Sequence, residues 1–171
     1  PKGIITQDGR QIDLDVIIYA TGYHLDFLST LDIRGRDGRT LQQEWGDSPR
    51  AYRGGTVPGF PNLFINSAPN YRPGHGAGAN FSMEVMAHFI VECLQLMALR
   101  GATTMEVTRQ AYEEYVAAID EAMSQTVWCH TPNAHTYYRS GSGRVVVSTP
   151  YRLVDVWQQH RAPVEDHFTL R

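Results

Sequence analysis

The sequence has few of the features typical of a disulfide scaffold, a metal-binding protein or a nucleic-acid binder. It has 171 residues, only two cysteines and a formal net charge of −3. Two cysteines without metal-ligand spacing form neither a disulfide framework nor a zinc site, so we expect a reducing compartment, the cytoplasm. The small negative charge gives no electrostatic reason to bind nucleic acid or an anionic membrane surface.

Long apolar runs and targeting signals are also lacking. No apolar run approaches the ~20 residues that a transmembrane helix requires, and no signal peptide is visible, so we expect no membrane span. Hydrophobic residues make up 42% of the chain and charged residues 19%, which is an ordinary globular balance. The length fits one domain or a large piece of one. Because the chain begins with Pro1 and its first residues read as mid-domain sequence, we expect a fragment.

Motifs of a self-sufficient active site are missing as well. The sequence contains no nucleophile elbow, phosphate-binding loop or Ser/His/Asp arrangement. His130 and His135 lie in one segment but lack an acidic or cysteine partner, so no metal site is predicted. Three arginines between residues 34 and 39 alternate with aspartates, and we interpret them as a solvated rim rather than an anion site. No catalytic residue is therefore assigned.

The most informative stretch is Asp15 to His24, DVIIYATGYH. Residues 3–6 and 11–20 are predicted to be strands joined by a tight turn at Asp8-Gly9. The second strand becomes a continuous β-branched and aromatic run, the pattern of a strand buried on both faces. Ala20, Thr21 and Gly22 then interrupt it, and small residues there let another backbone or a flat ligand approach the end of the strand. The alternative is a core strand that ends in a glycine turn.

A second stretch, residues 56–70, has the same organisation. The prolines and the glycine of VPGFP fix a rigid turn. Leu63 to Ile65 are then predicted to form a short buried strand, which ends at Asn66 in small and polar residues. Two buried strands that end alike favour one shared site at their carboxyl ends.

The glycine segment Gly74 to Ala79 precedes a long helix that is predicted to end at Gly101, with Asn80 or Ser82 as its N-cap. The segment matches the letters of a dinucleotide fingerprint, but no strand leads directly into it, and this argues against a complete dinucleotide site. Its exposed amides at a helix start would suit a carbonyl or an anion. A flexible loop with a cap remains an alternative.

Two further helices and a loop complete the prediction. Residues 109–128 form a helix with Thr108 as N-cap, and a shorter helix follows Pro150 and ends before Pro163. Between them, Trp128 to Arg139 form a loop rich in aromatic and polar residues, including Asn133, that is suited to cover a pocket. Residues 144–147 are predicted to be a strand. The expected fold class is therefore α/β, with short sheet strands, β-hairpins and about three helices.

These segments together resemble the C-terminal part of class B flavoprotein monooxygenases, the Baeyer–Villiger and flavin-containing monooxygenase family. The resemblance spans nearly the whole chain. It is carried by the lead-in at residues 1–3, the ATG strand at 15–22, GFPNLF at 59–64 and the helix start at 82–84. The closing segments SGRVV at 142–146 and PYRL at 150–153 look most like the 4-hydroxyacetophenone monooxygenase subgroup.

The resemblance implies an enzyme that uses FAD, NADPH and molecular oxygen to oxygenate a small ketone or a soft nitrogen or sulfur atom. The chain, residues 1–171, would be the C-terminal portion of the FAD-binding domain of a flavoprotein with two dinucleotide-binding domains. The fingerprints and the catalytic residues would lie upstream of Pro1, so the isolated chain is expected to be inactive. The resemblance implies cofactor contacts at Thr21, Gly22, Asn62, Asn66, Ala79, Asn80 and Trp128.

Two other functions stay open at this point. The chain could be a stand-alone nucleotide-binding module that uses residues 74–79. It could also be a non-catalytic interaction protein that exposes apolar faces and forms a homo-oligomer.

Overall fold

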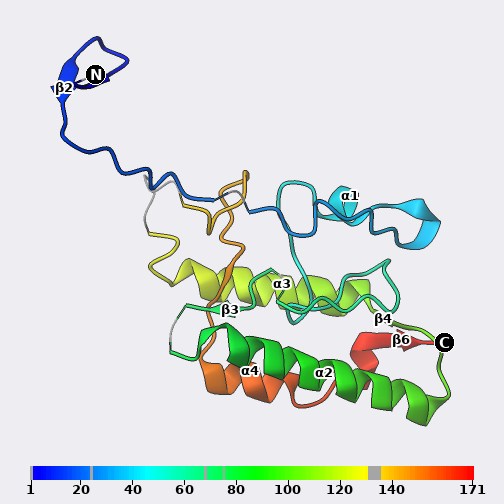
Figure 1. Cartoon of the computed structure of the whole chain (residues 1–171). Coiled ribbons are helices and arrows are strands. Elements are labelled where there is room, and N and C mark those ends of the chain that lie inside the picture. Colours follow the sequence, from blue (N-terminus) through cyan, green and yellow to red (C-terminus); the bar gives the residue numbers. More distant parts are fainter. Residues whose placement is uncertain (1, 24, 68, 75, 131–135) are drawn as a thin grey trace.

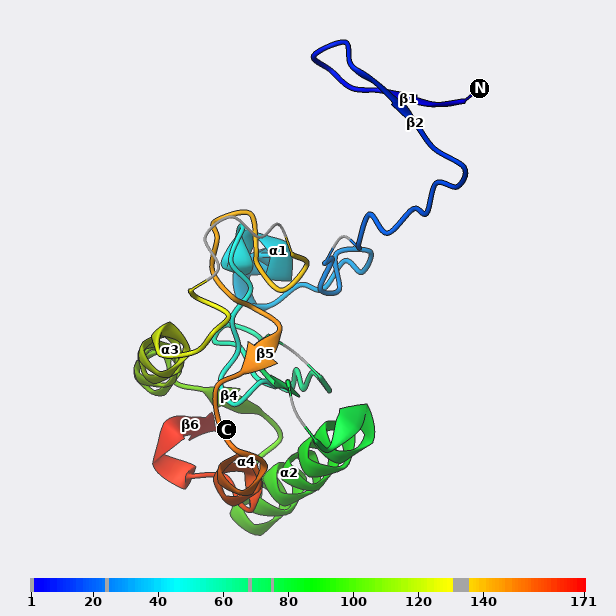
Figure 2. The ribbon, with the colours of Figure 1, turned by 90° about the vertical axis from the view of Figure 1, so that its left-hand side faces the viewer.

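The computed structural model describes residues 2–171 except His24, Ala68, His75 and residues 131–135. Two long helices, α2 (Gly78–Arg100) and α3 (Arg109–Ser124), form most of its body, and the shorter α4 (Leu153–His160) packs along α2. Strands β4 (Met105–Val107) and β6 (Phe168–Leu170) pair antiparallel. Both views place α3 on one side of the body and α2 with α4 on the other (Figures 1 and 2). The main core therefore lies between these helices, and side chains of β4 and β6 contribute to it.

The long helices follow from local signals in the sequence. The side chain of Thr108 accepts a hydrogen bond from the Ala111 N–H, as an N-cap does. The apolar face of α3 buries Tyr112, Ile119 and Met123. At the end of α2, Gly101 adopts the left-handed conformation (φ 62°) and its N–H bonds the last turn. Both predictions are confirmed, although α3 ends at Ser124, before the predicted Trp128.

A smaller second core lies around α1 (Leu41–Trp45), a helix that was not predicted from the sequence. Thr40 and Gln43 form a capping box, in which each side chain accepts a hydrogen bond from the other residue's backbone N–H. The helix buries Leu41 and Trp45 against residues of the following loop: Ala51, Val57, Phe60 and Ile65. Before α1, η1 (Arg36–Gly38) turns the chain back on itself between the paired residues Arg34 and Thr40.

The strands form three separate two-stranded ladders within the described residues. Besides β4 and β6, β1 (Gly3–Ile5) pairs antiparallel with β2 (Gln11–Asp13), and β3 (Arg72–Pro73) pairs parallel with β5 (Ser148–Thr149). The predicted hairpin is thus confirmed, with Gly9 at φ 83° in its turn. A second 3-10 turn, η2 (Glu165–His167), leads into β6. The α/β class is confirmed, with four α-helices in the described residues.

The ATG stretch is not a buried strand in this structure. β2 ends at Asp13, and the run from Val16 to Tyr19 is extended and exposed, with Ile18 85% and Tyr19 84% accessible. It leads from the hairpin to the body as an isolated arm (Figures 1 and 2). A strand needs hydrogen-bonding neighbours, and no described segment of this chain lies beside it. The predicted strand is therefore absent from this structure, although residues 16–19 have the apolar composition of a buried strand.

Two other predicted strands are also corrected. Residues 63–65 run without strand pairing, and the Ile65 N–H donates to the Gly55 carbonyl (2.8 Å) within a compact loop. Residues 145–147 are buried, but in this region only Ser148 and Thr149 form a regular strand. Both segments are apolar because they fill the core, which does not require a ladder.

Helix α2 is long and apolar enough, by length and composition, to cross a membrane. The expectation that no run is long enough is therefore wrong. The observation is weak evidence for a span, because the core helix of a globular protein meets the same criterion. One face of α2 buries Val85, Met86, Phe89, Cys93 and Met97 in the main core.

Candidate functional site

A cavity of about 890 Å³ lies where the arm meets the body. The end of the ATG stretch lines it with Thr21, Gly22 and Tyr23, and the loop after residue 135 lines it with Tyr137 and Arg139. The segment around α1 forms the remaining wall. Two predicted cofactor residues, Thr21 and Gly22, are thus brought to the same cavity as the aromatic loop.

An aromatic ladder connects this cavity to the region before α2. Tyr23 meets Tyr137 edge to face, with ring centroids 6.3 Å apart. Tyr137 stacks on Tyr138 at 4.4 Å, and Tyr138 packs against Trp128 at 4.5 Å. Contacts of this kind stabilise a loop by about 0.5–1.5 kcal/mol per pair. The ladder therefore holds the aromatic loop in one position relative to the ATG stretch.

Trp128 in turn lies against the glycine segment. A methyl group placed on Gly74 would lie 3.3 Å from the Trp128 ring, so the ring would have to shift by a few tenths of an ångström to admit a side chain there. The Arg139 guanidinium donates to the Trp128 and Gly143 carbonyl oxygens and fixes the ends of the loop. The loop is thus anchored beside the start of α2, where the sequence predicted a cover over a pocket.

Among the described residues, no side chain caps the start of α2, so its first backbone N–H groups are available as donors. Gly76 and Gly78 have φ of 75° and 68°, conformations that glycine adopts without strain. The N-cap is Ala77, and no side chain caps the helix, so the prediction of Asn80 or Ser82 as N-cap is wrong. Ala79 and Asn80 are exposed in the first turn. Uncapped N–H groups at a helix N-terminus favour a carbonyl oxygen or an anion.

The two predicted asparagines lie in different surroundings. Asn66 is exposed, and its Nδ2 lies 3.4 Å from the Met83 carbonyl oxygen of α2, so the 63–66 segment does reach this helix. The Asn62 side chain donates to the Thr103 carbonyl (3.0 Å) and accepts from the Met105 N–H (2.9 Å). Asn62 thus fixes the turn after Gly59 onto β4. Its assignment as a cofactor contact stays a prediction.

Sequence reasoning missed the individual residues that connect these two regions. It predicted the loop from Trp128 to Arg139 as a cover but assigned no role to Tyr23, Tyr137 or Tyr138. The sequence feature that could have indicated these residues is the high density of tyrosines in YATGY (residues 19–23) and HTYYR (residues 135–139). Asn133 and His135 of this loop lie outside the described residues.

In the described part of the site, the titratable side chains that share a hydrogen bond are two tyrosines, Tyr137 and Tyr138, which are not an acid–base pair. The hydrogen bond between the Tyr137 and Tyr138 hydroxyl groups (3.1 Å) raises the pKa of Tyr138 above its usual value. Among the described residues, no group of three histidine, cysteine or carboxylate side chains is placed to hold a metal ion. The arrangement of backbone donors, small residues and aromatic rings is suited to binding a planar cofactor.

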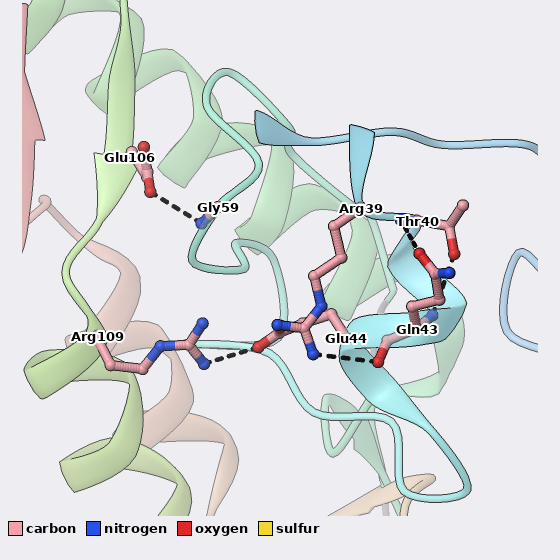
Figure 3. A network of polar contacts seen from close by, with 7 residues as sticks. All are labelled: Arg39, Thr40, Gln43, Glu44, Gly59, Glu106 and Arg109. Atoms are coloured by element: carbon pink, nitrogen blue, oxygen red, sulfur yellow. Dashed lines mark hydrogen bonds and ion pairs between the residues drawn. The ribbon is translucent and has the colours of Figure 1, made fainter. Parts of the chain in front are cut away.

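Polar contacts hold the wall of the cavity and the turn after Val57 onto the rest of the body. The carboxylate of Glu44 in α1 forms ion pairs with Arg39 (3.1 Å) and with Arg109 of α3 (2.7 Å). Figure 3 shows this carboxylate between the two guanidinium groups. Glu106 of β4 accepts a hydrogen bond from the Gly59 N–H (2.8 Å). These contacts fix α1 and the 57–62 turn relative to α3 and β4.

Comparison with curated proteins finds monooxygenases. The chain is 32% identical over 172 residues, 99% of its length, to an uncharacterised monooxygenase of Sinorhizobium fredii, of which it covers 26%. It is 33% identical over 84% of its length to a Baeyer–Villiger monooxygenase of Pseudomonas aeruginosa, and covers 27% of it. A phenazine N-monooxygenase of Lysobacter antibioticus is 33% identical over 74% of the chain, which covers 23% of that protein. No family model matches the chain.

Solved structures agree with these relatives. An oxidised steroid monooxygenase bound to NADP matches 99% of the chain with a TM-score of 0.77 and 28% identity, and the chain covers 32% of it. The enzyme named OTEMO, in complex with FAD and NADP, matches the full chain with a TM-score of 0.72 and 28% identity, again over 32% of the solved chain. The homologues of this chain are thus Baeyer–Villiger and other flavin monooxygenases. The chain spans only about a quarter to a third of their length.

Proposed function

We propose that this chain is the C-terminal portion of the FAD-binding domain of an FAD- and NADPH-dependent monooxygenase. The observation that carries the proposal is the match in sequence and in structure to flavin monooxygenases over 99% of the chain. The uncapped start of α2 and the aromatic loop beside it fit a flat, polar cofactor. The two free cysteines, of which Cys93 is buried, agree with a cytoplasmic protein.

The residues present fit FAD and NADPH in three respects. The α2 amides near Ala79 and Asn80 would donate to an electron-rich ring edge. Thr21 and Gly22 add little side-chain volume to their cavity, so a cofactor could pass close to the backbone. The ring of Trp128 would cover the nicotinamide side. FAD, when bound, supplies the redox chemistry that activates oxygen.

This chain's own residues then have a binding and covering role. The N–H donors at the start of α2 would orient the cofactor. Asn66, beside this helix, would limit the lateral movement of the cofactor. The ladder from Tyr23 to Trp128 would exclude water from the covered side. Because the described residues contain no acid–base pair in the site, the isolated chain is proposed to be inactive.

The substrate is proposed to be a small ketone, with 4-hydroxyacetophenone as the specific candidate. The names of two relatives, a Baeyer–Villiger monooxygenase and a phenazine N-monooxygenase, leave ketone and nitrogen oxygenation as the two reaction types to separate. The segments at 142–146 and 150–153 favour the acetophenone-type ketone.

The test uses the complete polypeptide that the gene encodes, purified beside the 171-residue chain. We expect flavin to co-purify with the complete polypeptide and 4-hydroxyacetophenone to stimulate its NADPH consumption, with the ester as product. The 171-residue chain should bind no FAD stoichiometrically and turn nothing over. A complete polypeptide without flavin would contradict the proposed function, and oxygenation only of amines or sulfides would contradict the substrate.

Gly22→Val, with Gly9→Val as its matched control, tests the cofactor contact. Both glycines have φ of 83°, and no atom lies within 4 Å of the position that a Cβ atom would take, so the two substitutions impose the same backbone strain. Gly22→Val should reduce the flavin content severalfold, whereas Gly9→Val in the distant hairpin should leave it unchanged. Equal flavin content in both variants would refute a role of Gly22 in cofactor binding.

A further inference from the structure

The β4–β6 ladder has one apolar face and one polar face. Its apolar face is buried in the main core through Met105, Val107 and Phe168. Because side chains alternate along a strand, the residues between these point the other way, and Glu106 lies directly opposite Thr169 in the register. Arg171 continues this polar face, since its backbone N–H still donates to the Thr104 carbonyl oxygen (3.0 Å).

A cavity of about 480 Å³ opens on the polar face of the ladder. It is lined by residues of four segments: Arg36 of η1, Pro58 and Gly59 of the 57–62 turn, Glu106 to Arg109, and Thr169 with Arg171. Figure 3 shows part of this wall, with Glu106 directed at the turn and Arg109 at the start of α3. In the described part of the chain, this cavity shares no lining residue with the larger cavity beside the arm.

Positive charge exceeds negative charge around this second cavity, because three arginines and one carboxylate line it. The carboxylate of Glu106 is already engaged: one oxygen accepts from the Arg36 guanidinium and the other from the Gly59 N–H (2.8 Å). Arg109 pairs with Glu44 (2.7 Å), which does not line the cavity. The start of α3 adds a partial positive charge.

Arg171 is the arginine with donors to spare. Among the described residues it is bonded through its backbone alone, to Thr103 and Thr104, and it is exposed. A guanidinium group has five N–H donors in a planar fork, which matches two oxygens of an oxyanion. The hydroxyl group of Thr169, on the same face of the ladder, adds a further donor.

We propose that this cavity binds the phosphate group of a small ligand in solution, with Arg171 and Thr169 as donors and Arg36 and Arg109 as supporting cations. A phosphate group suits the cavity better than a carboxylate, because it carries more negative charge and has enough oxygens for several guanidinium groups. The cavity is larger than a phosphate group, so the rest of the ligand also has room. The inference is independent of the proposed function, since no predicted cofactor residue lines this cavity.

Isothermal titration calorimetry with inorganic phosphate, at pH 7.5 and constant ionic strength, tests the site. It is run on the 171-residue chain and on the complete polypeptide. Arg171→Gln removes the main donor, and Thr169→Val removes the hydroxyl group but keeps the shape. Arg161→Gln is the matched control, because Arg161 is also an exposed arginine but does not line the cavity. Circular dichroism confirms that each variant is folded.

We expect the 171-residue chain to bind phosphate saturably, with the dissociation constant raised at least about fivefold by Arg171→Gln and about threefold by Thr169→Val. Arg161→Gln should change it by less than about twofold. Absence of saturable binding, or equal weakening by the two arginine variants, overturns the proposal. Binding of heparin without binding of phosphate also overturns it, because an extended polyanion would then be the ligand.

The complete polypeptide shows whether the cavity stays open in the whole protein. Phosphate bound elsewhere in it does not depend on Arg171, so the site is measured as the difference between wild type and Arg171→Gln. We expect the variant to lose one phosphate site. Identical titrations of the two proteins would overturn the proposal, whereas the flavin content, recorded separately, bears only on the proposed function.

Discussion

The imidazole Nε2 of His160 lies 2.8 Å from the backbone carbonyl oxygen of Arg53, 107 residues earlier in the chain. The contact is reciprocal, because the Arg53 guanidinium donates to the carbonyl oxygens of Gln159 and Ala162 at the end of α4. The His160 ring also packs against Tyr71 and Phe89, at centroid distances of 4.9 and 5.3 Å. One buried histidine thus joins α4, α2 and the loop that contains Arg53.

His160 should make the stability of the chain depend on pH. Burial lowers its pKa below the usual value near 6.5, so the unfolded chain takes up a proton at a higher pH than the folded chain does. The free energy of unfolding should therefore fall as the pH drops from about 7 through the folded-state pKa. His160→Phe should cost about 1–3 kcal/mol at pH 7.5, because the Arg53 carbonyl loses its partner, and should flatten the pH dependence.

Urea denaturation between pH 7.5 and 5 measures this effect. His130→Gln, at an exposed position, is the control for the replacement of a histidine. A His160→Phe variant with the wild-type pH dependence would show that another group titrates.

Asn70 should be sensitive to an isosteric change. Its buried Nδ2 donates to the carbonyl oxygens of Val145 (2.9 Å) and Ser148 (3.1 Å), beside the ladder of β3 and β5. Asn70→Asp keeps the shape and the left-handed backbone (φ 56°) but places a carboxylate against two acceptors. We expect a loss of about 1–3 kcal/mol at pH 7 that becomes smaller at pH 4, when the carboxyl group is protonated and can donate.

Thermal melts of Asn70→Asp at both pH values, relative to wild type at the same pH, measure the loss. Asn80→Asp, at an exposed position of α2, should be neutral or slightly stabilising because a negative charge suits a helix start. An equal loss in both variants would contradict the role given to the Asn70 amide.

Glu44 should contribute more to stability than an ordinary surface carboxylate. Its side chain is only 6% exposed and pairs with Arg39 and Arg109, and the hydrogen bond to Glu44 raises the pKa of Arg109. Glu44→Gln should lower the free energy of unfolding by about 1–2 kcal/mol, less than for a fully buried pair because both arginines are partly solvated. Glu114→Gln, on the exposed face of α3, is the control. Chemical denaturation at low and high salt should show the difference shrinking with salt.

Gly54 should tolerate no side chain. It has φ of 67°, and a methyl group there would lie 2.6 Å from the Tyr71 ring, in the middle of the main core. Gly54→Ala should destabilise the chain by at least about 2 kcal/mol, from backbone strain together with displacement of the ring. Gly141 has open space at the Cβ position and no left-handed backbone conformation. Gly141→Ala should therefore change the free energy of unfolding by less than about 0.5 kcal/mol. Comparable melting temperatures would contradict this packing of Gly54 against Tyr71.

Structural features that depend only on residues adjacent in the sequence were predicted correctly. The Thr108 cap, the Gly101 end and the Asp8-Gly9 turn need only a few adjacent residues, and all three occur in the structure. The capping box of α1 was also readable, since Thr40 and Gln43 have the required spacing, but its five-residue helix has no periodic pattern to draw attention to it.

Predictions that depend on distant partners were less successful. The apolar residues 16–19 and 63–65 have strand composition, but composition does not supply a neighbouring strand. Pairing of β4 with β6, more than sixty residues apart, leaves no local trace in the sequence. In the candidate site, the small residues and the aromatic loop could be identified from the sequence. The contacts among Tyr23, Tyr137 and Tyr138 could not, because they depend on how the fold brings residues 23 and 137 together.

The isolated arm between the β1–β2 hairpin and the body also determines where a protease would first cut this chain. An extended segment without backbone hydrogen bonds fits a protease cleft directly, whereas a helix must first unfold locally. The bonds after Tyr19 and Tyr23 are both exposed and aromatic, so chymotrypsin should release the first nineteen to twenty-three residues before it attacks α2 or α3. The remaining body would keep both cores, because neither includes a residue before Phe27.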